Sequence, residues 1–167
     1  IYVLVKEVMD NCIDEYTMGY GKTVELNIDG KTVTVRDHGR GIPLGKVVDV
    51  VSKINTGAKY DSKAFQKSVG LNGVGTKAVN ALSSYFKVMA VREGKEKTAE
   101  FERGFLIKEH KEAKTGEDNG TMVTFIPDET VFKNFKFHPE FLENQIWNYC
   151  FLNAGLKIVF NGRSFVS

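Results

Sequence analysis

The sequence predicts an α/β fold, an α+β two-layer sandwich whose mixed, mostly antiparallel sheet carries helices on one face. Two observations predict it. Short alternating apolar segments are joined by tight turn signals, as in hairpins, and segments with helical apolar spacing lie between them. The chain has 167 residues, of which 42% are hydrophobic and 26% charged. That size and composition are typical of one soluble domain with its own core, so we expect residues 1–167 to form a single domain.

The chain should begin with a helix and a hairpin. Residues 2–18 carry apolar side chains one turn apart, at Leu4, Val8, Cys12 and Tyr16. Glycines at 19 and 21 should end this helix. Strands at 24–28 and 32–36 flank Asp29-Gly30, which is a type I′ turn signal.

The remaining elements follow the same two patterns. Helices are predicted at residues 47–54, 73–82 and 141–152, and strands at 85–92, 98–101, 121–126 and 157–160. Glu93-Gly94 and Asn161-Gly162 are expected to be hairpin turns. Residues 55–72 have little periodicity and are expected to be a long functional loop, and residues 108–119 a charged surface connection.

Charge and cysteine content exclude several classes of protein. The net charge of +2 gives no indication of nucleic-acid binding. Cys12 and Cys150 lie far apart in apolar runs without zinc-ligand spacing, so we expect both to be reduced core residues. The apolar start is interrupted by Lys6 and Glu7, which excludes a signal peptide or membrane span. Because no Met begins the chain, we expect a piece of a longer cytoplasmic protein.

Glu7 and Asn11 are the first candidate site residues. They are four residues apart, so they share one helix face, which also carries Leu4 and Val8. A carboxylate there can act as a general base for water, and an amide oxygen can bind Mg²⁺. The alternative is an ordinary solvated helix edge.

A second candidate site is the segment from Asp37 to Pro43. An ionised carboxylate is an acceptor only, so Asp37 can accept from the amino group of adenine, where guanine has a carbonyl. Gly41 leaves the backbone open to a flat ligand, and Ile42 and Pro43 can form walls for it. The alternatives are an ordinary Asp-x-Gly turn and a surface ion pair for Arg40.

A third candidate is the glycine-rich run from Gly70 to Gly75. Gly70, Gly73 and Gly75 allow backbone N–H groups to turn toward an anion, and a helix should begin there. No Walker lysine follows, and the spacing is not that of a dinucleotide fingerprint. Lys59 can reach a phosphate, and the Thr121 hydroxyl can meet a base or a water. A plain glycine loop, a solvated lysine and a strand threonine are the alternatives.

Taken in this order, the motifs resemble those of the Bergerat-fold, or GHKL, ATPases. Four motifs carry the resemblance: Glu7-x-x-Asp10-Asn11, Asp37-x-Gly39-x-Gly41, Gly70-Leu71-Asn72-Gly73-Val74-Gly75 and Gly120-Thr121. Within that superfamily the chain is similar to the B subunits of bacterial type II topoisomerases, DNA gyrase B and topoisomerase IV B. The runs that are similar to theirs extend nearly from end to end, including Gly39-Arg40-Gly41-Ile42-Pro43 and Phe151-Leu152-Asn153-Ala154-Gly155.

The resemblance implies ATP and Mg²⁺ as ligands and a role for each matching residue. Glu7 would polarise the attacking water, Asn11 would hold Mg²⁺, and Asp37 would bind the adenine amino group with Gly41 and Thr121 nearby. Arg40 would line the pocket mouth and pair with Glu15, and Arg92 would lie at the rim where coumarin-type inhibitors of the family bind. Residues 59–75 would be the ATP lid, with Lys59 near the ribose and phosphates. The lid's N–H groups would come from its last residues, Leu71, Asn72, Gly73, Val74 and Gly75.

It also implies partners and a larger context. ATP binding would close a homodimer of the intact B subunit during DNA strand passage, together with the A subunit. The family's N-terminal arm and transducer domain are expected to lie outside this chain. We therefore expect residues 1–167 to bind ATP, hydrolyse it very slowly and remain monomeric. A MutL-type or chaperone ATPase and a non-catalytic nucleotide sensor are the alternative functions.

Overall fold

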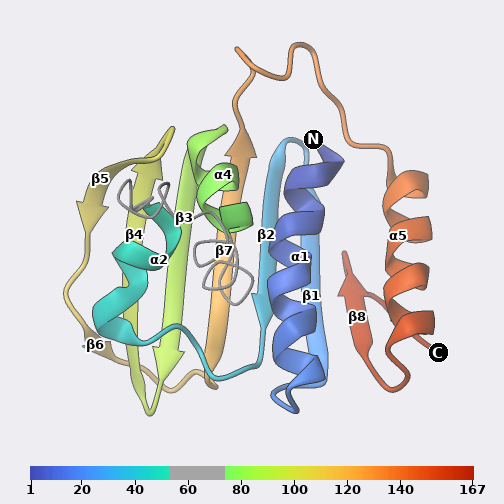
Figure 1. Ribbon diagram of the computed structural model, residues 1–167, viewed down its shortest axis with the longest axis horizontal. Helices are drawn as coiled ribbons and strands as arrows, with labels where there is room; N and C mark the ends of the chain where they lie inside the picture. Colours follow the sequence, from blue (N-terminus) through green and yellow to red (C-terminus); the bar gives the residue numbers. More distant parts are fainter. Residues whose placement is uncertain (53–73) are drawn as a thin grey trace, which may run out of the picture.

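A computed structural model of the chain describes residues 1–52 and 74–167, and these form one mixed sheet with helices on one side. The sheet order is β5-β4-β3-β7-β2-β1-β8-β9, and β6 pairs with β4. Figure 1 shows the strands side by side. The strands are β1 (Thr23–Asp29), β2 (Thr32–Asp37), β3 (Ser83–Arg92), β4 (Lys95–Glu102), β5 (Phe105–Glu109), β6 (Ala113–Lys114), β7 (Gly120–Pro127), β8 (Lys157–Phe160) and β9 (Arg163–Val166).

Every strand pairing within the described residues is antiparallel except that of β1 with β8. This parallel pair arises because the chain leaves β7, forms a helix and returns to the far side of β1. The predicted fold class, a mixed and mostly antiparallel sheet, is therefore confirmed.

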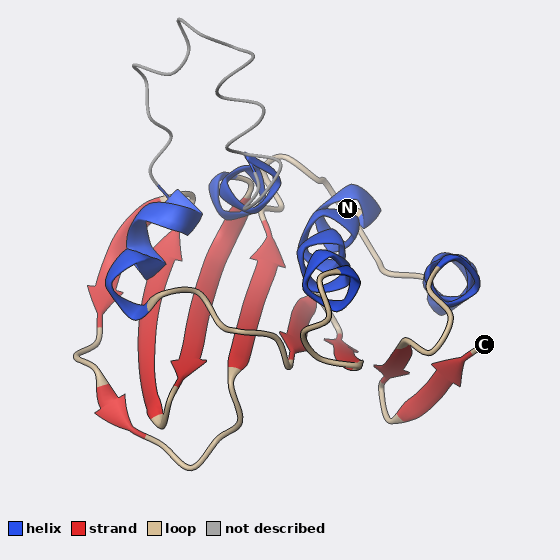
Figure 2. Ribbon diagram, turned by 60° about the horizontal axis from the view of Figure 1, so that its bottom comes forward, coloured by secondary structure: helices blue, strands red, loops and turns tan. Residues whose placement is uncertain are grey.

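The helices cover a single face of the sheet, as Figure 2 shows. They are α1 (Tyr2–Thr17), α2 (Val47–Ser52), α4 (Val74–Ala81) and α5 (Pro139–Leu152), with a short 3₁₀ turn η1 (Leu44–Lys46) before α2. The core lies between the two layers. Val8 and Met9 of α1, Val35 of β2, Phe86 of β3 and Phe125 of β7 are almost fully buried in it. Strand residues alternate between this core and the open face, as a half-covered sheet requires.

The hairpins confirm the predicted turns with one correction. Glu93-Gly94 and Asn161-Gly162 have positive φ at both residues, as a type I′ turn requires. Arg103-Gly104 forms a third such turn, between β4 and β5. The first hairpin turn lies one residue later than predicted: Asp29 still pairs with Thr32, and only Gly30 of the Gly30-Lys31 loop has positive φ. The prediction of a type I′ turn at Asp29-Gly30 is therefore wrong.

The segment 108–119 is also more ordered than predicted. It contains the end of β5 and all of β6, which pair with β4 at the exposed sheet edge. The charged side chains that suggested a loop are those of an edge strand, whose side chains face solvent. The predicted loop at 55–72 lies outside the described residues.

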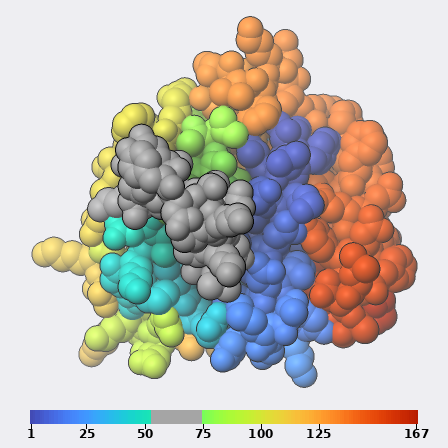
Figure 3. Space-filling view, in the orientation of Figure 1, coloured from blue at the N-terminus to red at the C-terminus, as the bar shows by residue number. Residues whose placement is uncertain are grey.

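The two ends of the chain pack against each other. In Figure 3 the C-terminal helix and strands, orange to red, lie beside the blue N-terminal helix. Tyr149 of α5 donates a hydrogen bond to Asp10 of α1 over 2.7 Å, and Tyr16 donates one to the carbonyl of Ala154 over 2.5 Å. Cys12 and Cys150 are both free and buried, as predicted. Among residues 1–52 and 74–167, none of the helices combines the length and apolar character needed to cross a bilayer.

Candidate functional site

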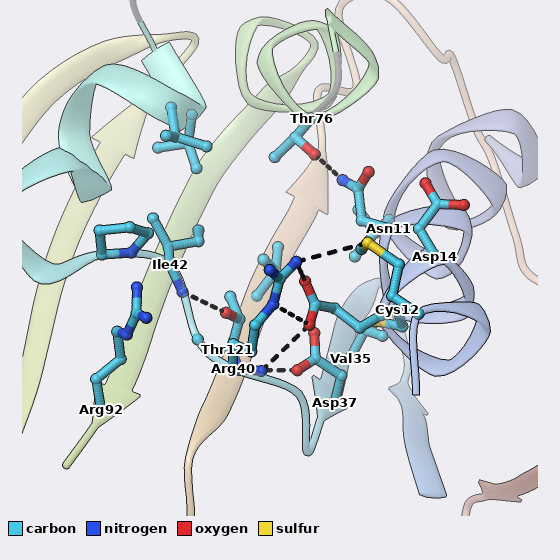
Figure 4. Close-up of a pocket in the computed structure, with 18 residues that line it drawn as sticks. Asn11, Cys12, Asp14, Val35, Asp37, Arg40, Ile42, Thr76, Arg92 and Thr121 are labelled. Carbon is cyan, nitrogen blue, oxygen red and sulfur yellow. Dashed lines mark hydrogen bonds and ion pairs between the residues drawn. The ribbon is translucent and has the colours of Figure 1, made fainter. Parts of the chain in front are cut away.

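A cavity of about 240 Å³ opens between the sheet and the helices, where α1, α2 and α4 meet the ends of β2 and β7. It brings together residues that are more than a hundred positions apart in the sequence (Figure 4). Seven of the predicted site residues line it: Asn11, Asp37, Arg40, Gly41, Ile42, Pro43 and Thr121. Its apolar walls come from Val8, Ile42 and Pro43 together with valines 35, 50, 51 and 123. A mostly apolar cleft with a few polar groups is the usual form of a small-molecule site.

Asp37 is the buried acceptor of this cavity. It ends β2, is only 7% exposed, and its Oδ1 accepts the N–H of Gly39 over 2.9 Å and that of Thr121 over 3.1 Å. Arg36 donates to the Asp37 carbonyl over 2.8 Å and so fixes the strand end. Among the described residues, no backbone N–H is bonded to the other carboxylate oxygen, Oδ2. Asp37 is therefore held rigidly, and its Oδ2 carries no backbone hydrogen bond among the described residues.

Burial sets the protonation chemistry of Asp37. Loss of water raises the pKa of its carboxyl above the ordinary value, against the opposing effect of the two backbone N–H groups. The nearby Glu15 carboxylate raises this pKa further, whereas the Cys12 thiol lowers it. Asp37 consequently titrates nearer to neutrality than a surface aspartate.

Arg40 forms one side of the cavity mouth. Its Nε and Nη2 donate to the two oxygens of Glu15 over 3.1 and 2.9 Å, the bidentate arrangement that arginine favours. The guanidinium also lies 4.5 Å from the ring centroid of Tyr20. Burial alone would raise the pKa of Glu15, but the hydrogen bonds and charge of Arg40 lower it overall. The predicted pairing of Arg40 with Glu15 is thus present in the structure.

The loop at Gly41 and Ile42 contacts the neighbouring strands at the edge of the cavity, and Thr121 provides one of these contacts. Gly41 has φ +80°, and a Cβ there would collide with the carbonyl of Val91. The next residue, Ile42, donates its N–H to the Thr121 hydroxyl over 3.2 Å. Because that oxygen already accepts from the backbone, the Thr121 O–H can be donated to a ligand or a water.

Glu7 and Asn11 face the beginning of α4. A Cβ at Gly75 would overlap the Glu7 carboxylate, so this side chain lies directly against the α4 backbone. One turn further along α1, the Asn11 amide nitrogen donates to the hydroxyl of Thr76. Glu7 borders α4 without lining the cavity itself.

The other predicted site residues divide into two groups. Lys59, Gly70, Leu71, Asn72 and Gly73 lie outside the described residues. Val74 and Gly75 are the first two residues of α4. The sequence interpretation missed Thr76, which is 4% exposed and lines the cavity. Its position directly after the glycine-rich run was the signal that could have identified it.

Among the described residues, the cavity offers a metal ion few protein ligands, which suits an ion that is also bound by the ligand's phosphates. No cluster of three or more histidine, cysteine or acidic ligands occurs within residues 1–52 and 74–167. The amide of Asn11 at the cavity wall offers one hard oxygen. Mg²⁺ is commonly held by only one or two protein oxygens, with its other positions filled by phosphates and water.

This buried aspartate, the glycine turn beside it and the helix-lined cavity over an open sheet define a class of nucleotide-binding domain. The family described as "Histidine kinase-, DNA gyrase B-, and HSP90-like ATPase" matches residues 1–131, and the chain belongs to it.

Individual relatives narrow the comparison. The chain is 50% identical over 167 residues to the B subunit of DNA topoisomerase 4 from Borreliella burgdorferi, matching 100% of this chain and 28% of that protein. It is 40% identical over 173 residues to the B subunit of DNA gyrase from Thermus thermophilus, matching 96% and 27% of the two chains. The chain thus spans little more than a quarter of the length of these curated relatives.

A solved structure has the same fold. The crystal structure of the 43K ATPase domain of Thermus thermophilus gyrase B, in complex with an aminocoumarin, superposes with a TM-score of 0.82. The sequences are 29% identical, and the match covers 98% of this chain and 45% of the other. Together these comparisons confirm the resemblance to the ATPase domain of type II topoisomerase B subunits.

Proposed function

We propose that this chain is the ATP-binding and ATP-hydrolysing domain of a bacterial type II DNA topoisomerase B subunit, either gyrase B or topoisomerase IV B. The observation that carries the proposal is Asp37, a buried carboxylate that lines an apolar cavity and has one oxygen fixed by two backbone N–H groups. Its place within a chain of this ATPase family supports adenine as the base that it recognises.

In this proposal the cavity selects adenine. Asp37 Oδ2 accepts a hydrogen from the exocyclic amino group, and the Thr121 hydroxyl donates to the base directly or through water. Ile42 and Pro43 contact the flat face of the base. Guanine would present a carbonyl to the carboxylate, and two acceptors repel each other. Arg40, held by Glu15, closes the cavity mouth.

The α1–α4 boundary would hold the triphosphate end. Asn11 would bind Mg²⁺, which supplies charge neutralisation to the phosphates. Glu7 would accept a proton from the attacking water as general base. Backbone N–H groups of residues 70–75, with Lys59, would bind the phosphates, because N–H groups at the start of a helix favour anions.

The wider role follows from the relatives named above. We propose that residues 1–167 act as one ATP-binding domain of a longer cytoplasmic protein. That protein would use ATP to close a homodimer of B subunits and pass DNA together with an A subunit. Hydrolysis by residues 1–167 alone should be very slow, and this fragment should be monomeric.

The test is a calorimetric titration of the protein with a non-hydrolysable ATP analogue in Mg²⁺, beside the corresponding GTP analogue. We expect adenine-selective binding that Asp37→Asn reduces at least tenfold, because the amide can present a donor where the carboxylate presents only acceptors. Asp29→Asn is the matched control: Asp29 is exposed beside the first hairpin turn, so binding should be unchanged.

Three results would contradict the proposal. Equal affinity for the ATP and GTP analogues would show that the site does not select adenine. Full binding by Asp37→Asn would remove Asp37 from the site. An absence of binding by folded wild-type protein would remove nucleotide binding altogether.

A further inference from the structure

We propose that Thr76 is a positioning residue that fixes the orientation of the Asn11 amide, so that the amide oxygen faces the bound nucleotide and its metal. The inference rests on the proposed function and extends it. It assigns a role to a residue on α4 that belongs to none of the four motifs and would act through Asn11.

The geometry begins with one hydrogen bond between two helices. The Asn11 side chain on α1 donates from Nδ2 to Oγ1 of Thr76 on α4, across 65 positions of sequence. Thr76 is 4% exposed, and both residues line the cavity. Figure 4 shows the Asn11 amide nitrogen directed at the Thr76 hydroxyl and the amide oxygen pointing away from Thr76. Within the described residues, no hydrogen bond ends on that oxygen.

An asparagine needs such a partner to serve as a metal ligand. Its two terminal atoms are similar in size but opposite in character, since the oxygen accepts and the nitrogen donates. Only the oxygen can bind a cation, so a flipped amide would point N–H groups at Mg²⁺. A hydroxyl that accepts from Nδ2 favours the productive orientation.

Thr76 is suited to this task by its own rigidity. A β-branched side chain in a helix has few χ1 rotamers, and threonine is restricted mainly to two, so its hydroxyl occupies few positions. The preceding residue, Gly75, lies against the Glu7 carboxylate, and this fixes the spacing of α4 from α1 at the same level. The first turn of α4 therefore contacts both predicted polar residues of α1, and Thr76 provides the side-chain contact.

The experiment measures the contribution of the metal to binding, separately from turnover. Titrations with a non-hydrolysable ATP analogue are run in Mg²⁺ and in EDTA, and the ratio of the two dissociation constants is the Mg²⁺ increment. Thr76→Val keeps the shape of the side chain but removes the acceptor. We expect the increment to fall about tenfold, as for other partners of metal ligands. Affinity in EDTA should stay within about twofold of the wild-type value, because the hydrogen bond joins two protein side chains and does not involve the ligand.

Two further variants separate positioning from folding. Thr76→Ser keeps the hydroxyl but loses the β-branch, so it should restore most of the wild-type increment. In an Asn11→Asp background both terminal atoms are oxygens, so orientation no longer matters and Thr76→Val should leave the increment unchanged. If Thr76→Val does not fold, Thr76→Ala replaces it, because alanine also lacks the acceptor and favours a helix.

The outcomes distinguish this inference from the proposed function. An unchanged increment in folded Thr76→Val, or no increment in wild type, would overturn the positioning role while leaving ATP binding in place. A larger increment in Thr76→Val would also overturn it, since the hydroxyl would then compete for the amide oxygen. Failure of wild-type protein to bind the analogue at all would instead overturn the proposed function.

Discussion

At the scale of single residues, the site depends on how the carboxylate of Asp37 is held in the cavity. One oxygen is committed to the N–H groups of Gly39 and Thr121, and the surrounding apolar walls remove water from the carboxylate. The group is held in position and partly desolvated before any ligand arrives. Pre-organisation of this kind lowers the entropy lost when a ligand binds.

The raised pKa of Asp37 predicts a pH dependence of nucleotide binding. Binding requires the ionised form as acceptor, so affinity for an ATP analogue should weaken as the pH falls toward a pKa above the ordinary value of about 3.9. The free energy of unfolding responds in the opposite sense. Because the folded state holds this proton more tightly, its stabilising contribution is complete below about 3.9 and is lost as the pH rises through the folded pKa.

Calorimetric titrations at several pH values between neutrality and the acid limit of the folded state would measure the binding effect. Asp37→Asn supplies the control, since its residual binding should show less dependence on pH. A wild-type affinity that stays constant over this range would show that the proton on Asp37 is not coupled to binding.

At the scale of elements, the loop after β2 matters most to the cavity. Gly41 has φ +80° and lies against the backbone carbonyl of Val91, which belongs to a different strand. Gly94 has nearly the same φ, +78°, but a Cβ there would meet open space. The two glycines therefore differ in their surroundings and not in their backbone conformation.

Alanine substitutions at these two positions should have different effects on stability. Gly94→Ala should cost about 1 kcal/mol, because a side chain in the left-handed region is strained. Gly41→Ala should cost about 1–3 kcal/mol more, because the new methyl must also push a strand carbonyl aside. Urea unfolding of both variants measures the difference. Equal losses of stability would mean that the loop moves aside at no cost.

At the scale of the whole molecule, the sheet connects the nucleotide cavity to the C-terminal edge. The cavity lies over β2 and β7, whereas β8, β9 and α5 lie beyond β1. Trp147, the one tryptophan of the chain, stacks on Phe151 at 5.6 Å and meets Phe165 edge-on at 5.0 Å. Its fluorescence therefore reports on the edge of the sheet that lies away from the ligand.

The continuous core predicts one cooperative unfolding transition. Trp147 fluorescence and far-ultraviolet circular dichroism should give the same urea curve. An ATP analogue at 100 times its dissociation constant should raise the free energy of unfolding by about 2.7 kcal/mol in both signals. At the same concentration the increase should fall to about 1.4 kcal/mol or less in Asp37→Asn, whose dissociation constant is expected to be at least tenfold larger. A fluorescence curve unaffected by the ligand would show that the α5 edge unfolds separately.

Local sequence patterns predicted many of the helices, hairpin turns and cavity residues of this protein. Apolar periodicity identified α1, α4 and α5, turn chemistry identified the hairpins at Glu93-Gly94 and Asn161-Gly162, and the motif residues Asn11, Asp37 and Thr121 do line one cavity. These signals are readable because each depends on neighbours within about one turn or one hairpin. The edge strands β5 and β6 were missed for the same reason: exposed charged residues look alike in a strand and in a loop.

Only the tertiary structure decided which groups meet. The bond from Asn11 to Thr76, the contact of Glu7 with Gly75 and the parallel pairing of β1 with β8 join segments that are distant in sequence. No local propensity encodes them, because they form when separate helices and strands bury their apolar faces against one another. The residue types came from the sequence, whereas packing set the burial of Asp37 in the cavity and the orientation of the Asn11 amide.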